Sequence, residues 1–142
     1  MRIQDVLRSK GGQVFTIGPD ATVTELLAAL AEHNVGALVV SSDGSTVVGI
    51  VSERDVVRRI QSSGVAVLDG PVSQIMTSTV TTCTEQDGVE DLMRLMTDHR
   101  IRHVPVLRDG ELVGVISIGD VVKSRIGELE HERSNLIGYI AG

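Results

Sequence analysis

The chain has 142 residues, of which 42% are hydrophobic and 23% charged, a balance typical of one globular domain with a sizeable core. Its formal net charge of −6 argues against a general nucleic-acid binder, and the scarcity of aromatic residues removes the stacking platforms that bind single strands. The single cysteine excludes an internal disulfide, the Cys and His residues lack the spacing of a metal site, and no apolar run approaches the roughly 20 residues of a membrane span.

The first twelve residues, MRIQDVLRSKGG, lack the apolar centre of a signal peptide, so we expect a soluble protein of the cytoplasm. An amphipathic helix is then predicted from apolar residues at the spacing of one helix face: Val23, Leu26, Leu27 and Leu30. Thr22 followed by Glu25 is a capping-box pattern and predicts where this helix begins.

A β-hairpin and a second helix follow. Apolar strands are predicted over 36–40 and 46–52, and Asp43-Gly44 lies between them, a dipeptide typical of tight hairpin turns. The second helix is expected to start near Ser52. Residues 61–71 carry Gly, Ser and Pro and form a linker.

The same elements are predicted again after the linker. The helix face repeats at identical spacing in Val89, Leu92, Met93 and Met96. Strands are predicted over 103–107 and 111–117 around Asp109-Gly110, and another helix begins near Ser117. Residues 123–142 have no counterpart in the first half. They predict a helical extension whose amphipathic end carries four apolar side chains: Leu136, Ile137, Tyr139 and Ile140.

The chain is therefore an internal duplication. Residues 22–57 match 88–122, and the lead-in residues 3–7 match 72–76. A half of about 60 residues would be marginally stable alone, so we expect the two halves to form one structural unit. The predicted fold class is α/β, of the α+β kind: two pseudo-symmetric repeats in tandem, each a small β-sheet with two flanking helices.

Three of these patterns together resemble the CBS domain: RIRHVPV at 100–106, the return strand after each Asp-Gly, and a Ser-x-x-Asp box in each half, at 52–55 and 117–120. Two CBS domains in tandem resemble a CBS pair, or Bateman module. The resemblance covers nearly the whole chain and indicates a stand-alone CBS-domain protein. It divides the chain into repeat 1 (1–62), repeat 2 (63–127) and a C-terminal helical extension (128–142), with both repeats in one module.

The resemblance implies a ligand that contains adenosine: AMP, ADP, ATP, an NAD-type dinucleotide or S-adenosylmethionine. Two clefts would lie between the halves. In each, the aspartate of the Ser-x-x-Asp box would hold the ribose hydroxyls, and the serine with nearby basic residues would face the phosphates. Apolar side chains, largely from the opposite half, would surround the adenine. CBS pairs also commonly associate as flat dimers, so we expect a homodimer.

The two Ser-x-x-Asp boxes also have a purely structural interpretation. Each satisfies the capping-box pattern, and local sequence alone favours a helix cap. The same geometry suits a ligand, because a helix N-terminus attracts phosphate and a carboxylate can accept from two adjacent hydroxyls. Gly119 would let a ligand approach the backbone. The resemblance and the repetition favour a ligand site, with capping as a second role.

Basic residues distinguish the two clefts. The family's cross-half arrangement implies that the Asp55 cleft receives Arg102 and His103, and that the Asp120 cleft receives Gly36 and Ala37. The Asp55 cleft would then be more cationic and the Asp120 cleft roomier. Two interpretations remain open beside this one: the basic stretch is a solvated strand edge, and His103 is a structural histidine. Glu53 departs from the pattern, since a carboxylate beside phosphates is unfavourable unless it points away.

The predicted function is a non-catalytic regulatory or sensor module whose ligand is an adenine nucleotide (AMP, ATP or NAD). The candidate ligand-binding residues are Val14, Val35, Gly36, Ala37, Ile50, Ser52, Arg54, Asp55, Arg58, Val80, Ile101, Arg102, His103, Pro105, Val115, Ser117, Gly119 and Asp120. The alternative is a structural or protein-interaction CBS protein that binds no nucleotide. No catalytic motif, catalytic cofactor, membrane contact or nucleic-acid contact is expected, whereas a regulated partner protein is.

Overall fold

A computed structural model of the chain describes residues 1–141, and residue 142 of the predicted extension lies outside the described part. The helices are α1 (Ile3–Lys10), α2 (Val23–His33), α3 (Glu53–Ser63), α4 (Val89–His99) and α5 (Ile118–Ala141). The strands are β1 (Thr16–Ile17), β2 (Ala37–Val40), β3 (Gly49–Ser52), β4 (Cys83–Thr84), β5 (His103–Arg108) and β6 (Glu111–Ser117). Two short 3-10 helices, η1 (Val65–Asp69) and η2 (Val72–Gln74), lie in the connection between the halves.

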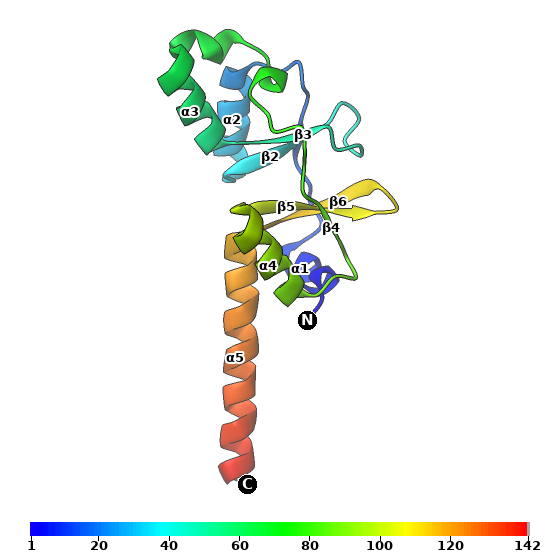
Figure 1. The fold of residues 1–142 in the computed structure, drawn as a ribbon. Helices are drawn as coiled ribbons and strands as arrows, with labels where there is room; N and C mark the ends of the chain where they lie inside the picture. Colours follow the sequence, from blue (N-terminus) through cyan, green and yellow to red (C-terminus); the bar gives the residue numbers. More distant parts are fainter. Residues whose placement is uncertain (142) are drawn as a thin grey trace.

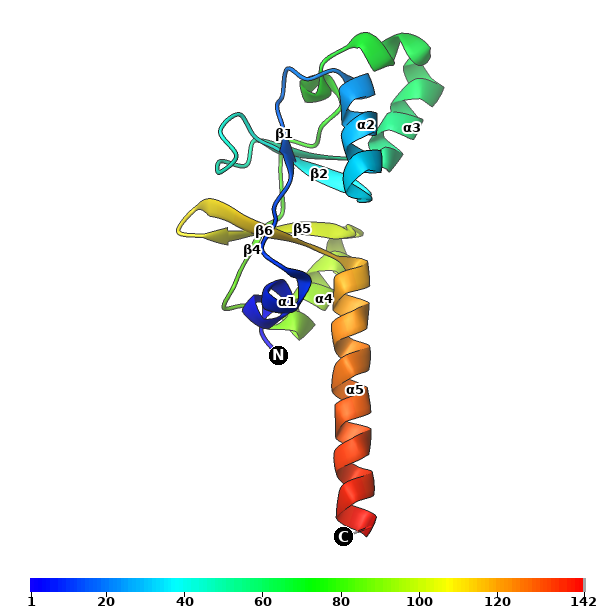
Figure 2. The same ribbon diagram turned by 180° about the vertical axis from the view of Figure 1, so that it is seen from behind.

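The described residues form two three-stranded sheets in the orders β1-β2-β3 and β4-β5-β6. In each sheet the first two strands are parallel and the last two antiparallel. Figures 1 and 2 show the sheets next to each other in the middle of the molecule, with α2 and α3 outside one sheet and α1, α4 and α5 outside the other. This arrangement confirms the predicted mixed α/β class.

The pseudo-symmetry extends to single residues. Ala37 pairs with Ser52 in the first sheet, and His103 pairs with Ser117 in the second. Helix α2 is followed by the capping residue Asn34 with φ 52°, and α4 by Arg100 with φ 54°. Both residues are left-handed, a conformation that asparagine tolerates better than most side chains. The duplication seen in the sequence is thus a duplication of backbone geometry.

The two Asp-Gly dipeptides form different turns. Asp109 and Gly110, with φ 52° and 81°, lie directly between the paired residues Arg108 and Glu111, as a two-residue hairpin loop with two positive φ angles requires. In the first half, β3 begins only at Gly49, and residues 41–48 form the connection. The predicted hairpin is therefore present, but its loop is longer than a tight turn at Asp43-Gly44, and the predicted strand start at residue 46 is wrong.

The side chain of Asp43 explains this difference. Its Oδ1 accepts hydrogen bonds from Ser45 N at 2.8 Å and from Thr46 N at 2.7 Å. Such a local bond offers the backbone an alternative to strand pairing and favours a longer loop. These donors hold the pKa of the Asp43 carboxyl well below its usual range.

The lead-in segments exchange between the halves. Ile3 and Val6 of α1 are buried in the core of the second half, together with α4, β5 and the start of α5. Val72 and Ile75, which match them in sequence, are buried in the core of the first half with α2, β2 and β3. Each hydrophobic core therefore contains chain from both ends of the duplication.

Two equivalent glycines allow these lead-ins to approach the sheets. A Cβ built on Gly114 would lie 2.5 Å from Leu7 Cδ2, and one built on Gly49 would lie 2.5 Å from Met76 Sδ. Real Cβ atoms do not come that close, so the absence of a side chain at both positions lets each lead-in lie against a strand.

Helix α5 is one continuous helix of 24 residues. Its first turns contact α1 and α4, and Figures 1 and 2 show the remainder extending away from the molecule. No helix within residues 1–141 combines the length and hydropathy needed to cross a membrane. At the start of α2, the structure has one of the two predicted capping-box bonds, from Glu25 N to Thr22 Oγ1.

Candidate functional site

A cavity of about 320 Å³ opens between the two halves. The second half contributes His103, Val115, Ser117 and Asp120, and the rest of the lining comes from the first half: Lys10, Gln13, Val14, Phe15, Asn34, Val35, Gly36, Ala37 and Leu38. Its size and its mixture of apolar walls with a few polar side chains are typical of small-ligand sites. We call it the Asp120 cavity.

The Ser-x-x-Asp box of the second half is built at the junction of β6 and α5. Ser117 N donates to Asp120 Oδ2 at 2.9 Å, and Asp120 N donates to Ser117 Oγ at 3.2 Å. This reciprocal pair is a capping box, and it fixes both side chains at the helix N-terminus. The predicted capping role is thus present, and the same two side chains line the cavity.

Lys10, the last residue of α1, reaches into this box. Its Nζ donates to Asp120 Oδ2 at 2.7 Å and to the carbonyl oxygen of Val115 at 2.6 Å. Burial acts to raise the pKa of the Asp120 carboxyl, but the ammonium and the Ser117 N–H together hold it below its usual value. Asp120 is therefore ionised at neutral pH, with one cation within reach.

The first half repeats the box at the start of α3. Ser52 N donates to Asp55 Oδ2 at 2.8 Å, Ser52 Oγ donates to the same oxygen at 3.0 Å, and Asp55 N donates to Ser52 Oγ at 3.3 Å. The sequence position equivalent to Lys10 is Thr79, which carries no charge. The two boxes therefore share their backbone geometry but differ in the cation beside the aspartate.

His103 lies between the two halves. It lines the Asp120 cavity, and its Cε1 and Nε2 atoms would both lie 3.6 Å from a Cβ on Gly36. Glu53 Oε1, at the start of α3, would lie 3.3 Å from that same Cβ. Burial lowers the pKa of His103, and the Lys10 and Arg102 charges lower it further, partly offset by Asp120 and Glu53. A neutral imidazole is the favoured form at neutral pH.

The structure gathers eight of the predicted ligand-binding residues in the Asp120 cavity. They are Val14, Val35, Gly36, Ala37, His103, Val115, Ser117 and Asp120. The family's cross-half arrangement correctly predicted that Gly36 and Ala37 meet Ser117 and Asp120. Gly119 lies in the first turn of α5, where an added Cβ would meet only Ser117 Oγ within 4 Å.

The remaining predicted residues lie outside the residues that line this cavity. Ser52 and Asp55 form the other capping box, half-buried, and Ile50 on β3 exchanges backbone hydrogen bonds with Thr77. Three predicted basic side chains are exposed: Arg54, Arg58 and Arg102. Three apolar candidates are fully or partly buried near the second sheet: Val80, Ile101 and Pro105. Ile101 packs against the core of the second half.

The prediction that the Asp120 cleft carries little charge needs correction. The sequence interpretation gave His103 to the Asp55 cleft and left the Asp120 cleft with little charge. In the structure His103 lines the Asp120 cavity, and Lys10 forms an ion pair with Asp120. The reason is that α1, although part of the first repeat, packs against the second half. Its last residue, Lys10, therefore lies beside Asp120 of the second half, which reasoning about each half separately did not predict.

Sequence reasoning missed five residues that line the cavity: Lys10, Gln13, Phe15, Asn34 and Leu38. A basic residue directly before Gly11-Gly12 was the available signal for Lys10. Asn34 directly follows the predicted helix, and asparagine tolerates the left-handed conformation that often ends a helix, so this residue also had a sequence signal. Phe15 stacks on His33 at a ring-centroid distance of 3.7 Å, a contact without a sequence signal.

Metal binding and thiol chemistry find little support among the described residues. No group of three or more His, Cys, Asp or Glu side chains within the described residues is placed to hold a metal ion. Cys83 is buried, and burial raises the pKa of its thiol to about 12, which disfavours the reactive thiolate.

Comparison with known proteins yields one family and close structural relatives. The family model described as "CBS domain" matches residues 3–62 and again 72–127. The CBS domain-containing protein CBSX3, mitochondrial, of Arabidopsis thaliana is 40% identical over 148 aligned residues, which cover 99% of this chain and 72% of that protein.

Two solved structures are informative. The CBS-domain containing protein ATU1752 from Agrobacterium tumefaciens is 44% identical, with a TM-score of 0.84, over 88% of this chain and 99% of that one. The CBS domain pair of protein MJ0100, solved in complex with 5′-methylthioadenosine and S-adenosyl-L-methionine, has a TM-score of 0.77 at 22% identity, over 87% and 98% of the two chains. At that identity the likeness to MJ0100 is one of fold.

Proposed function

The chain belongs to the CBS domain family, and from this premise we propose that it is a regulatory module whose inter-repeat clefts bind a ligand that contains adenosine. The observation that carries the proposal is the ionised Asp120 in a cavity lined by both halves. A ligand in this position contacts both repeats at once. Its binding free energy can therefore stabilise one arrangement of the two halves over others.

The chemistry of the cavity matches the parts of an adenine nucleotide. A carboxylate such as Asp120 can accept from two adjacent ribose hydroxyls. Val14, Val35 and Val115 offer apolar surface to an adenine ring. Lys10 supplies a cation, and the positive end of the α5 dipole lies beside it, which together suit phosphate. We therefore propose AMP, ATP or NAD as the ligand type.

The MJ0100 complex supports the class of ligand rather than the individual compound. Its two ligands, 5′-methylthioadenosine and S-adenosyl-L-methionine, both contain adenosine and lack phosphate. Lys10 is the feature of the present chain that favours a phosphorylated ligand over these two. We propose that phosphorylated ligands prefer the Asp120 cavity to the Asp55 cleft.

A second function is favoured by one specific observation. Both Ser-x-x-Asp boxes are complete helix caps, and Lys10 already occupies Asp120. A structural or protein-interaction CBS protein that binds no nucleotide would need nothing more from these residues. The two functions differ in one respect: in the first, the Asp120 carboxylate releases Lys10 and binds the ribose hydroxyls of a ligand, and in the second it stays paired with Lys10.

Calorimetric titration of AMP and of S-adenosylmethionine tests the proposal. We expect AMP to bind the wild type, and Asp120→Asn to weaken it by about one to two decades, since hydrogen bonds to a charged group contribute about 1.5–3 kcal/mol. Asp55→Asn should affect AMP less. Asp98→Asn, at an exposed position on α4, is the matched control and should leave binding unchanged.

The two functions then separate. If neither ligand binds, and mass spectrometry finds no nucleotide released from the denatured purified protein, the interaction function stands instead. Equal affinities in all variants would show that the ligand binds away from both aspartates.

Several further properties belong to the same proposal. The division into repeats at 1–62 and 63–127, with an extension from 128, describes the module. We propose that it forms a homodimer, acts in the cytoplasm on a partner protein, and turns over no nucleotide. Hydrolysis of ATP that disappears in the Asp55→Ala variant would contradict the last point, and subcellular fractionation checks the location.

A further inference from the structure

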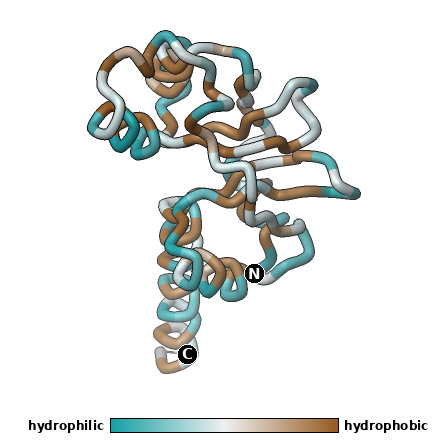
Figure 3. The backbone as a smooth tube through the Cα atoms, turned by 45° about the horizontal axis from the view of Figure 1, so that its top comes forward, coloured by the Kyte–Doolittle hydropathy of each residue, from teal (hydrophilic) through white to brown (hydrophobic). Residues whose placement is uncertain are grey.

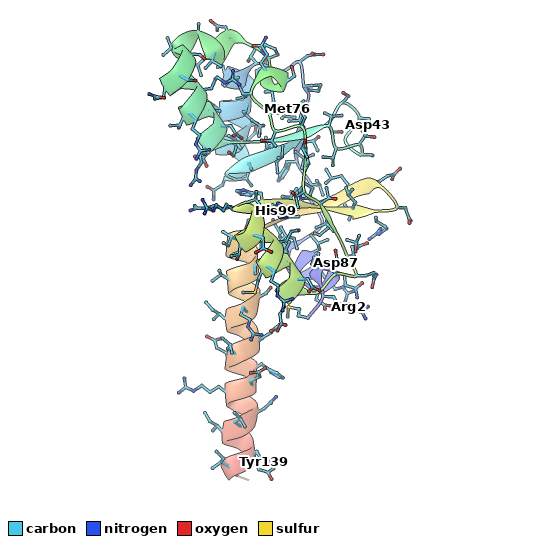
Figure 4. All side chains as sticks on the ribbon, viewed as in Figure 1. Arg2, Asp43, Met76, Asp87, His99 and Tyr139 are labelled. Carbon is cyan, nitrogen blue, oxygen red and sulfur yellow. The ribbon has the colours of Figure 1, made fainter. Side chains whose placement is uncertain are left out.

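Helix α5 carries an apolar stripe along its exposed length. Its five members are between 50 and 83% exposed: Val122, Ile126, Leu129, Leu136 and Ile140. Figure 4 shows the lower half of α5, down to Tyr139, with its side chains in open space, and Figure 3 shows hydrophobic residues recurring along it. An exposed apolar surface of this kind indicates an interaction site.

The spacing of the stripe is that of a coiled coil. Its residues follow at intervals of four, three, seven and four, and Arg133 fills the middle of the seven. This assigns Val122, Leu129 and Leu136 to d positions, and Ile126 and Ile140 to a positions. The stripe is separate from the face that packs on the molecule, where Val121 is only 2% exposed.

The helix also lacks the support that its length requires. An α-helix of 24 residues is about 36 Å long, and a helix without tertiary packing is marginal in water. Only its first turns contact α1 and α4 within the described residues. A partner along the stripe would supply the missing packing.

We propose that α5 forms a parallel two-stranded coiled coil with α5 of a second copy of this chain. This names the surface of the homodimer proposed above and does not depend on nucleotide binding. The arrangement is isologous, because the same stripe faces itself across a two-fold axis. The globular parts of the two copies then lie side by side at the N-terminal end of the coiled coil.

Charges beside the stripe favour the parallel arrangement. Arg125 occupies a g position and Glu130 the following e position, which face each other between parallel helices. Arg125 Nη1 bonds Glu128 Oε2 of its own helix at 2.7 Å, and in a parallel pair the other copy's Glu130 adds a second carboxylate beside the same guanidinium. Arg133 lies at an a position within the seam. Glu132, at the neighbouring g position, places a carboxylate close to Arg133 of the second copy. In an antiparallel pair with fully overlapping stripes, Glu130 would face Glu130 and Glu132 would face Glu132, which is repulsive.

A lipid surface fits the helix less well. Glu128, Glu130 and Glu132 follow each other at alternate positions in the middle of α5. Interfacial helices are instead rich in Lys and Arg on their polar face and bind anionic lipids through them. From Val122 to Leu129 the stripe is also one a/d seam wide, and it widens at its C-terminal end, where Ile137 and Tyr139 are exposed as well.

Disulfide trapping in the full chain tests the contact. Leu129→Cys places a thiol at a d position, where identical residues of a parallel pair lie opposite each other, and mild oxidation should yield a covalent dimer. His131→Cys, two residues further on at an outward f position, is the matched control and should remain monomeric on a non-reducing gel. The natural Cys83 is buried in both variants.

Sedimentation of non-oxidised variants gives the second measurement. Leu129→Glu should raise the dimer dissociation constant by about tenfold or more, and His131→Glu should leave it unchanged. If the wild type is a dimer, neither Leu129→Glu nor His131→Glu weakens it, and Leu129→Cys yields no covalent dimer, the coiled coil is overturned. The homodimer would still stand. A monomeric wild type overturns both. Flotation of a monomer with vesicles of phosphatidylcholine and phosphatidylglycerol would assign the stripe to a membrane surface instead.

Discussion

Lys10 Nζ lies 2.7 Å from Asp120 Oδ2, so the end of the first helix holds the aspartate that begins the last one. The two residues are 110 positions apart in the chain. If ribose takes the carboxylate, the ammonium is released at the mouth of the same cavity. Lys10 is therefore both a competitor for Asp120 and a candidate phosphate contact.

Replacing this lysine should change which ligands bind. In Lys10→Met, AMP should bind about one to two decades more weakly, because a charge-assisted bond to phosphate is lost. Adenosine should bind as well as to wild type or better, because Asp120 no longer has a competitor. Calorimetry of both ligands provides the measurement, and Arg8→Met, exposed on the same helix, is the control. An equal loss for AMP and adenosine would argue against the phosphate contact.

The glycines under the lead-ins should not accept a methyl group. Gly114→Ala and Gly49→Ala should each lower the free energy of unfolding by about 1–3 kcal/mol, as overpacking does. Denaturant titration followed by circular dichroism measures it. Gly127→Ala, in an open part of α5, should instead stabilise by about 0.5–1 kcal/mol. The cost of Gly114→Ala should shrink in a Leu7→Ala background, and an unchanged cost would exclude this clash as its cause.

Stability should depend on pH through His103. Its pKa is lowered in the folded protein, mainly by burial, so below about 6.5 the unfolded chain binds the proton more readily. Stability should be flat above that pH and should fall as the pH drops below it. Melting followed by circular dichroism from pH 8 to pH 5 should show a smaller fall for His103→Gln than for wild type. His131→Gln, on the exposed part of α5, should behave like wild type.

The two capping serines should both contribute to stability, and unequally. Removing a serine cap costs about 0.5–2 kcal/mol. Ser52→Ala should cost more than Ser117→Ala, because Ser52 Oγ both accepts from Asp55 N and donates to the Asp55 carboxylate. Ser134→Ala, exposed within α5, should cost nothing measurable in the same denaturant titrations. If Ser52→Ala and Ser117→Ala lower the free energy of unfolding no more than Ser134→Ala does, the two serines do not stabilise the helices as caps.

Local patterns predicted the local structure well. The helix at Val23 and its repeat at Val89 begin where the apolar spacing begins, because one buried face is enough to specify an amphipathic helix. Both Asp-Gly dipeptides lie in hairpins, but Asp109-Gly110 forms a two-residue loop, whereas Asp43-Gly44 lies in the longer loop 41–48. The same dipeptide differs because the Asp43 side chain bonds the following backbone, and the sequence pattern does not weigh that competition.

Long-range placement was predictable only in part. The duplication shows that Ile3 corresponds to Val72, but correspondence does not tell which sheet a segment covers. The exchange of lead-ins is settled by contacts between distant parts of the chain, and the position of Lys10 follows from it. Hence the resemblance correctly brought Gly36 and Ala37 to Asp120, whereas reasoning within one half missed the cation beside it.

The exchanged lead-ins have a consequence for the origin of the molecule. A chain with only one repeat would leave its sheet uncovered where Ile3 or Val72 now packs. It would complete its core only by lending its first segment to a second copy and receiving that copy's segment in return, as in domain swapping. Gene duplication and fusion would make such a swapped dimer covalent. The linker would then have replaced the association of two separate chains, which depends on protein concentration, by the association of two repeats within one chain.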